Sequence, residues 1–421
     1  MKNNLYFIGF LFIILVSCST TKQLEHDLEQ QSDINNYFRG FVVYDTKTNK
    51  EIINYNGAKY FTPASNTKLF TFYTAYRTFK DSVAGLEYEI LNDSLIIKGT
   101  ADPSLLYGTN ESKSISFLNN AKQNIYLVDE VIAEKPLGAG WSWDDYAYYY
   151  MPEKNLFPIY GNILKLSTAH DSIVVYPNFF ENTVKVADDR SQNREVHENV
   201  FYVSGTNQVK DREIPFKTSN QLVADLLSDE IGSKVTLISN SPDYNFKTLF
   251  SVKYDSLYKK MLHISDNFIA EQLMLQVGYQ VDSTYSVAKA IQYSLDNYLQ
   301  DIPQKPRWVD GSGLSRYNLF TPESYVFLLK KMYKEIPRDR LFSYLPAGGI
   351  SGTLKNYFEN EVPYIYAKSG TLSNNYNLSG YLVTKKGTVL IFSFMNNHYK
   401  GSASDRKKEM ALYFKKLYEK Y

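Results

Sequence analysis

A serine and a lysine that lie three residues apart, Ser65 and Lys68, precede an apolar run typical of a helix. Residues at positions i and i+3 share one face of a helix, so the Lys68 amine can lie beside the Ser65 hydroxyl. Burial and neighbouring positive charge lower the pKa of a lysine, and an unprotonated amine can take the proton of a serine nucleophile. The pair therefore predicts nucleophilic catalysis at a helix N-terminus, where negative charge is stabilised.

The Ser-x-x-Lys spacing alone does not select this position. Most such pairs in proteins are a surface serine and a solvated lysine, so further motifs must make the choice. In this chain the spacing also starts at Ser19, Ser256, Ser286 and Ser404.

Two further motifs follow in the chain. Ser265-Asp266-Asn267 lies inside residues 257–277, whose apolar pattern predicts one amphipathic helix, and Lys368-Ser369-Gly370-Thr371 ends a strand predicted at 364–368. Ser-x-x-Lys, Ser-Asp-Asn and Lys-Thr-Gly, in this order, are together the signature of penicillin-interacting serine enzymes. Lys-Ser-Gly occurs once in this chain. The three motifs together favour an acyl-transfer site at Ser65.

Each side chain of the three motifs has a role in such a reaction. Ser65 would attack a peptide carbonyl and form an acyl-enzyme, with Lys68 as the base. Ser265 would relay a proton to the leaving amine, and Asn267 would hold the substrate amide. Lys368 would keep the cleft positive and tune Lys68.

The third motif also supplies groups for substrate binding. The hydroxyls of Ser369 and Thr371 would bind a terminal carboxylate, with Gly370 between them. The backbone N–H groups of Ser65 and Thr371 would form the oxyanion hole, where loss of one donor typically costs about a hundredfold or more in rate.

The elements that must position these groups predict an α+β fold. A β-hairpin is expected over residues 41–55, two strands over 380–383 and 388–394, and a closing helix over 404–421. Between them, short β-like runs predict an inserted β-rich domain with one helix at 219–231. We assign residues 36–85 and 248–421 to the catalytic domain, and 86–247 to the insert.

The N-terminus predicts export. An apolar run from Leu5 to Val16 is too short to span a bilayer and is typical of a signal peptide, assigned to residues 1–17. Leu15-Val16-Ser17-Cys18 resembles a bacterial lipobox, in which the cysteine is lipidated. Cys18 is the only cysteine, so no disulfide can form within one mature chain. The polar residues of 18–35 predict a flexible tether.

Composition narrows the function further. The 421 residues are 44% hydrophobic and 22% charged, as in folded soluble proteins. The formal net charge of +1 gives no global field for nucleic acid, so no nucleic-acid partner is expected. The five histidines show no metal-ligand spacing, so neither a metal nor a cofactor is expected.

The sequence from about Tyr37 to Phe414 resembles the class C, low-molecular-mass penicillin-binding proteins, the D-alanyl-D-alanine carboxypeptidase/endopeptidase family. Beyond the three motifs, the residues that carry the resemblance are Thr62–Leu69, Gly99–Leu105, Gly140–Asp145, Ser265–Leu273, Asp310–Arg316 and Leu345–Gly349. Ser265 follows Ser65 by 200 residues, too long a segment for a serine β-lactamase. Ser369 stands where the family more often has threonine, but the hydroxyl is kept.

The resemblance implies a transpeptidase-like domain, with an antiparallel sheet flanked by helices, interrupted by a β-rich insert. It implies a D-Ala-D-Ala carboxypeptidase, with possible D,D-endopeptidase activity, that acts on peptidoglycan stem peptides and is acylated by β-lactams. Trp141 and Asp144 would bind the side-chain end of the stem peptide, Asp144 through a cationic amine. With the lipobox, we expect a membrane-anchored lipoprotein that faces the periplasm.

Two alternatives stay open at this point. One is a β-lactamase or esterase on the same scaffold, which would turn over a penicillin quickly. The other is a non-catalytic cell-wall-binding lipoprotein, which would bind peptidoglycan without releasing D-alanine.

Overall fold

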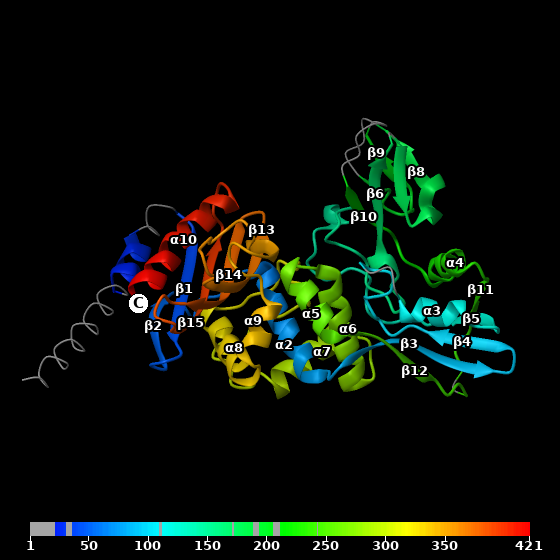
Figure 1. Ribbon diagram of the computed structural model, residues 1–421, viewed down its shortest axis with the longest axis horizontal. Coiled ribbons are helices and arrows are strands. Elements are labelled where there is room, and N and C mark those ends of the chain that lie inside the picture. The colour runs from blue at the N-terminus through cyan, green and yellow to red at the C-terminus, as the bar shows by residue number, and fades with distance from the viewer. Residues whose placement is uncertain are drawn as a thin grey trace, which may run out of the picture. The chain divides into compact units, whose positions relative to one another are not determined.

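The computed structural model describes residues 22–30, 36–108, 112–170, 172–187, 193–204, 211–241 and 243–421 (Figure 1). These residues form two compact units. The first contains the chain up to Tyr73, Tyr258–Ser265 and Ser294–Tyr421, and the second contains Thr74–Leu257 and Asp266–Tyr293. The predicted insert, residues 86–247, does not coincide with the second unit, and its boundaries stay a prediction.

A five-stranded antiparallel sheet forms the centre of the first unit. Its order is β13-β14-β15-β1-β2. The predicted hairpin and the two predicted C-terminal strands are confirmed. The strands are β1 (Phe38–Asp45), β2 (Lys50–Tyr55), β13 (Ile365–Leu372), β14 (Asn375–Val383) and β15 (Val389–Asn397).

One face of this sheet packs against the C-terminal helix α10 (Ala403–Lys420), which confirms the predicted closing helix (Figure 1). Phe394 on β15 stacks on Phe41 of β1, with ring centroids 4.3 Å apart, and Phe414 of α10 packs edge-on against both. Such aromatic pairs add to the hydrophobic gain of burial.

Residues 22–30 are helical and pack into the same core, where Leu24 and Leu28 are fully buried. The expectation of a flexible polar tether is therefore wrong for these nine residues. Two leucines at i and i+4 suffice to give a short helix one apolar stripe. The predicted signal peptide, Cys18 and the other residues of 18–35 lie outside the described residues.

The opposite face of the sheet packs against α8 (Pro322–Glu335) and the short helix η1 (Ala64–Thr67). Helix α8 begins with a capping box, in which Thr321 and Ser324 each accept the other's backbone N–H, and Pro322 sits at a position that needs no N–H donor. Helix α9 (Arg338–Tyr344) and the short helix η5 (Gly352–Leu354) follow.

Three helices pass from one unit to the other along the chain: α2 (Lys68–Thr78), α5 (Tyr254–His263) and α7 (Val287–Asn297). The single helix predicted over 257–277 is wrong, because α5 ends at His263 and α6 (Asn267–Asp282) begins anew. Ser265 adopts a left-handed φ of 62° between them, and Asp266 caps α6 by accepting from Ile269 N at 2.9 Å.

Among the residues that the structure describes, the second unit contains three sheets. The predicted helix at 219–231 is confirmed as α4 (Asn220–Ile231), and α3 (Lys113–Asn119) was not predicted. The largest sheet has the order β11-β5-β4-β3-β12, the next β10-β6-β7, and β8 pairs with β9. Their bounds are β3 (Ser82–Leu91), β4 (Ser94–Lys98), β5 (Asn124–Val128), β6 (Ile163–Ala169), β7 (Ser172–Tyr176), β8 (Val184–Val186), β9 (Phe201–Val203), β10 (Arg212–Pro215), β11 (Val235–Ile238) and β12 (Lys247–Lys253), with short helices η2 (Trp143–Asp145), η3 (Tyr160–Asn162) and η4 (Asn178–Thr183).

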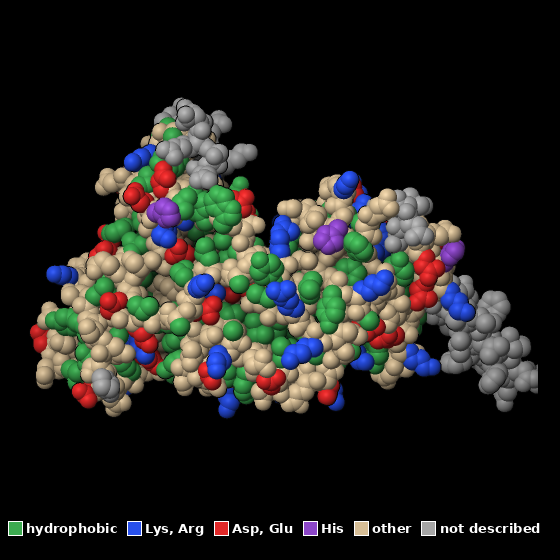
Figure 2. Space-filling model, turned by 180° about the vertical axis from the view of Figure 1, so that it is seen from behind, with side chains coloured by type: hydrophobic (Ala, Val, Ile, Leu, Met, Phe, Trp, Pro, Cys, Tyr) green, Lys and Arg blue, Asp and Glu red, His purple; other side chains and the backbone are tan. Residues whose placement is uncertain are grey.

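The surface of the described residues carries both signs of charge. Figure 2 shows basic and acidic side chains interspersed with apolar ones on one face, in keeping with the formal net charge of +1. Among the helices that the structure describes, none combines the length and the apolar character needed to cross a membrane.

Candidate active site

The first motif brings Ser65 and Lys68 together as predicted. Ser65 lies on η1, and Lys68 opens α2 with its side chain fully buried. Lys68 Nζ lies 3.0 Å from Ser65 Oγ, within hydrogen-bond distance. Thr67 Oγ1 donates to Ala64 O at 3.0 Å, and Asn66 Nδ2 donates to Ser379 Oγ on β14 at 2.9 Å. Side chains on both sides of the serine thus fix the turn that presents it.

Lys68 has a second partner that the sequence did not identify. Its Nζ donates to the backbone carbonyl of Ser312 at 2.6 Å. This carbonyl is held by a turn around the buried Asp310 carboxylate, which accepts from Gly313 N at 2.9 Å and Ser315 N at 2.6 Å. Gly313 has φ 82°, and a Cβ there would lie 2.0 Å from Ala64 O. The resemblance singled out Asp310–Arg316, and the structure explains it as the support of the Lys68 amine.

The second and third motifs meet through their own lysine and serine. Lys368 Nζ donates to Ser265 Oγ at 2.9 Å and to Ser369 O at 2.7 Å. Lys368 is fully buried, and burial together with the neighbouring Lys68 ammonium holds its pKa well below the usual value. Two buried amines that repel each other give up a first proton more readily than a solvated lysine. The pair can therefore provide an unprotonated amine at a lower pH than a solvated lysine does.

Strand β13 runs directly against the nucleophile turn. A Cβ on Gly370 would lie 2.4 Å from Pro63 O and 3.0 Å from Ser65 N, so only glycine permits this approach. Thr371 is exposed at the end of the strand, while Ser369 is buried and its Oγ donates to Thr353 Oγ1 at 2.7 Å. The sequence did not indicate this contact between Ser369 and Thr353, which lies on η5. The strand therefore brings the backbone of Gly370 against the turn that carries Ser65.

Three predicted site residues belong to the second unit. Asn267, at the start of α6, donates from Nδ2 to Tyr150 O at 2.7 Å. Trp141 is half-buried, and its ring covers Gly138 and lies 5.8 Å from the Lys154 ammonium. Asp144 is exposed on η2. Their predicted roles toward substrate stay predictions.

The segment after Ser265 is anchored inside the second unit. Tyr107 donates its hydroxyl proton to Asp266 Oδ2 at 2.6 Å, a contact that no motif indicated. Burial, followed by the Asp266 charge, raises the pKa of Tyr107, so the phenol stays a donor. Asp266 thereby caps α6 with one carboxylate oxygen and binds Tyr107 with the other.

His263 lies at the end of α5, two residues before Ser265. It is half-buried, and its Nε2 lies 3.3 Å from Ser343 O. Burial and the charges of Lys259 and Lys368 lower its pKa. Within the described ranges, no group of three or more His, Cys, Asp or Glu side chains is placed to hold a metal ion.

The sequence matches a known protein family and several of its named relatives. The model of a family described as D-Ala-D-Ala carboxypeptidase 3 (S13) matches residues 20–417. A Haemophilus influenzae protein named D-alanyl-D-alanine carboxypeptidase DacB is 25% identical over 427 residues, covering 89% of this chain and 88% of its own length. A Dictyostelium discoideum protein named penicillin-sensitive carboxypeptidase A is 25% identical over 400 residues, covering 79% and 76%.

Solved structures share the fold. Penicillin-binding protein 4 from Haemophilus influenzae superimposes with a TM-score of 0.72 at 22% identity, over 90% of this chain and 94% of that chain. A predatory endopeptidase from Bdellovibrio bacteriovorus, solved with an immunity protein, gives a TM-score of 0.55 at 15% identity, over 90% and 92%. The predicted α+β, penicillin-binding-protein-like fold is therefore confirmed.

Proposed function

The chain belongs to the D-Ala-D-Ala carboxypeptidase 3 (S13) family, and from this premise we propose that it removes the terminal D-alanine of peptidoglycan stem peptides through an acyl-enzyme on Ser65. The observation that carries the proposal is the 3.0 Å contact between Lys68 Nζ and Ser65 Oγ, beside a second buried amine, Lys368. This arrangement supplies a nucleophile and a base. Burial and the repulsion between the two ammonium groups disfavour the state in which both lysines are charged.

The reaction would proceed in two steps. Ser65 Oγ attacks the carbonyl carbon between the two D-alanines as its proton passes to Lys68 Nζ, and the intermediate oxyanion is bound by the backbone N–H groups of Ser65 and Thr371. The C–N bond then breaks, and the leaving amine takes a proton through Ser265, which Lys368 holds in place. Water then attacks the ester carbon in place of the amine as Lys68 takes its proton. The C–O bond to Ser65 breaks, Ser65 Oγ receives that proton back, and the shortened peptide leaves.

Substrate recognition would begin with the third motif. The hydroxyls of Ser369 and Thr371, next to the Lys368 charge, suit a terminal carboxylate, which is a planar anion with four acceptor sites. Asn267 would hold the substrate amide, and Trp141 and Asp144 the side-chain end of the stem peptide. A cross-linked stem peptide presents the same D,D bond, so endopeptidase activity follows from the same chemistry. A β-lactam, whose ring amide replaces that bond, would acylate Ser65.

We also propose that the chain is a lipoprotein attached through Cys18 and facing the periplasm. The support is the short apolar run that ends in Leu15-Val16-Ser17-Cys18. Metabolic labelling with a fatty acid, compared between wild type and Cys18→Ala, tests this directly. An equal label in both proteins would rule it out.

Two measurements test the enzymatic proposal. A fluorescent penicillin should label wild type and leave Ser65→Ala unlabelled, whereas equal labelling would exclude Ser65 as the nucleophile. Mass spectrometry of purified muropeptides after incubation should show loss of one alanine. Conversion of dimers to monomers would reveal endopeptidase activity, and unchanged muropeptides would contradict the proposal.

A further inference from the structure

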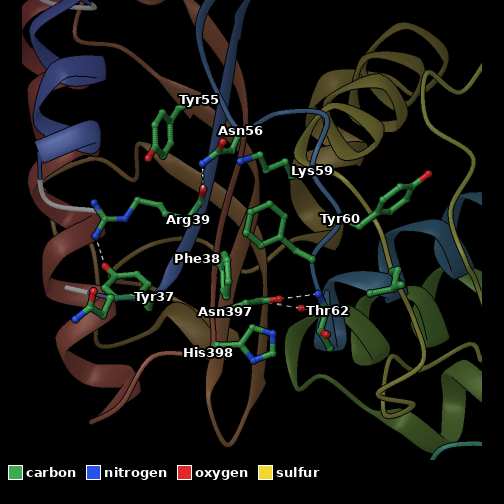
Figure 3. A pocket seen from close by; sticks show the side chains of 13 residues that line it. Tyr37, Phe38, Arg39, Tyr55, Asn56, Lys59, Tyr60, Thr62, Asn397 and His398 are labelled. Atoms are coloured by element: carbon green, nitrogen blue, oxygen red, sulfur yellow. Dashed lines mark hydrogen bonds between the residues drawn. The ribbon is translucent and has the colours of Figure 1, made fainter. Parts of the chain in front are cut away.

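A cavity of about 710 Å³ opens at one end of the five-stranded sheet of the first unit. It lies between the start of β1, the end of β2 and the end of β15 (Figure 3). None of the three signature motifs lines it. The residues that matter for its chemistry are Phe38, Arg39, Asn56, Lys59, Asn397 and His398.

The lining is cationic and aromatic. No aspartate or glutamate is among the described residues that line the cavity, while Lys59 is exposed and forms no ion pair within the described chain. Phe38 is 64% exposed, which is unusual for so large an apolar ring, and it meets the His398 ring edge-on at 5.6 Å. In Figure 3, Lys59 reaches toward Asn56, and Phe38 and His398 lie across from them. A ligand that combines an anionic group with an apolar face fits such a lining.

Behind this lining lies a buried guanidinium. Arg39 Nη2 donates to the Tyr37 hydroxyl and to Glu409 Oε1, while its Nε and Nη1 have no hydrogen-bond partner. Asn56 Nδ2 donates to Arg39 O at 2.9 Å, which fixes that amide at the cavity wall. Because the guanidinium is fully buried and paired with Glu409, it supports the wall of the cavity, and Lys59 offers the exposed positive charge to a ligand.

The cavity lies at the same end of the sheet as the substrate-binding end of β13. In the strand register, Leu372 pairs with Asn375, Asn375 with Asn397, and Asn397 with Phe38. Because neighbouring strands lie about 4.8 Å apart, Phe38 is about 14 Å across the sheet from Leu372, the residue after Thr371. An extended stem peptide of five residues spans up to about 17 Å.

A second connection leads to the nucleophile itself. Thr62 lines the cavity and donates from its backbone N to Asn397 Oδ1 at 2.6 Å, and Asn397 Nδ2 donates to Thr62 O at 3.2 Å. Thr62 precedes Ser65 by three residues, a reach of about 11 Å at most. A single substrate can therefore touch both places.

We propose that this cavity binds the sugar-proximal, carboxylate-bearing part of the muropeptide whose terminal D-alanine reacts at Ser65. The inference rests on the proposed function. Lys59 binds a free carboxylate of the stem peptide, and Phe38 packs against the apolar face of a sugar ring. The site makes the enzyme prefer whole muropeptides over short D-Ala-D-Ala peptides.

The test compares two substrates, a disaccharide-pentapeptide and a blocked tripeptide that ends in D-Ala-D-Ala. Lys59→Glu and Phe38→Ala should each raise KM about tenfold for the disaccharide-pentapeptide, leave kcat unchanged, and leave the tripeptide kinetics unchanged. Lys408→Glu, a charge reversal at an exposed position on α10, is the matched control and should change neither. Equal effects on both substrates, or none on either, would overturn the inference.

A binding measurement separates this inference from the proposed function. A disaccharide-tripeptide has no scissile D-alanine, and its Kd should rise about tenfold in Lys59→Glu, whether or not the wild type releases D-alanine. Unchanged Kd would overturn the inference even if catalysis is normal. A last experiment measures sedimentation of the protein with vesicles that contain anionic lipids. If sedimentation depends on Lys59 while muropeptide binding does not, the cavity binds a lipid headgroup and the inference is overturned.

Discussion

Lys368 Nζ donates a hydrogen bond to Ser265 Oγ over 2.9 Å, so the third motif holds the hydroxyl of the second. Ser265 pairs with this lysine from a left-handed backbone conformation, φ 62°, between two helices. Non-glycine residues adopt such a conformation rarely, and strain of this kind concentrates at functional sites. The chain interrupts a helix to place one hydroxyl against one buried amine.

The base should be Lys68. Replacing it by Met in Lys68→Met keeps the buried apolar stem and removes the amine, so acylation by a fluorescent penicillin should fall by about 10²–10⁴-fold. The matched control is Lys259→Met, because Lys259 belongs to another Ser-x-x-Lys pair and is exposed. Its acylation rate should equal that of the wild type. Rapid acylation of Lys68→Met would show that another group takes the proton.

Gly370 should be essential for rate through its close approach to the nucleophile turn. The Cβ of Gly370→Ala would meet Pro63 O at 2.4 Å, so β13 must move away from Ser65 N. A displacement of about 1 Å in such a site typically costs about a hundredfold in rate, and we expect that loss in penicillin acylation. Gly387→Ala is the control, because a Cβ there meets nothing within 4 Å. Gly387 has φ 83°, so this control should lose about 1 kcal/mol of stability and none of its acylation rate.

The pH dependence of acylation should reveal the coupled amines. Burial and Lys68 lower the pKa of Lys368, so a proton leaves the pair below the usual lysine value of 10.5. The acylation rate of the wild type should therefore rise with pH and level off well below that value. In Lys368→Met the repulsion is gone, the remaining amine keeps its proton to higher pH, and the rising limb should move upward. A rising limb at the same pH in both proteins would contradict the coupling.

The sequence predicted the groups of the site better than their supports. Ser65, Lys68, Ser265 and Lys368 were found because the reaction requires their side-chain types in a set order. Ser312 was not, because it holds Lys68 through a backbone carbonyl, which every residue has and no residue type signals.

The same limit explains two errors in the fold. Apolar residues continue on both sides of Ser265, so periodicity alone predicts one helix. The structure has two helices, and Ser265, which lies between them, contacts Lys368, 103 residues further along the chain. Over residues 22–30 the polar composition hid Leu24 and Leu28, which gain their partners only when β1 and α10 come together. Local patterns cannot report contacts of that sequence separation.

Stability of the second unit should depend on the buried carboxyl of Asp102. Burial raises its pKa from 3.8 to about 6, although Ser104 donates to it from both its backbone N and its Oγ, at 2.9 Å each. A carboxyl whose pKa is higher in the folded chain binds its proton more tightly when folded. The stabilisation is therefore complete below pH 3.8 and is lost as the pH rises through about 6.

Asp102→Asn should remove this loss, because an amide has no proton to give up and its oxygen can still accept from Ser104. The pKa shift of Asp102 corresponds to about 3 kcal/mol. Between pH 4 and pH 7, the free energy of unfolding of the variant, measured relative to that of the wild type, should therefore increase by up to about this amount. Urea unfolding followed by tryptophan fluorescence measures it, with Asp93→Asn, at an exposed turn, as the control. A constant difference between variant and wild type across that range would mean that Asp102 does not titrate there, because only a titrating group makes the difference depend on pH.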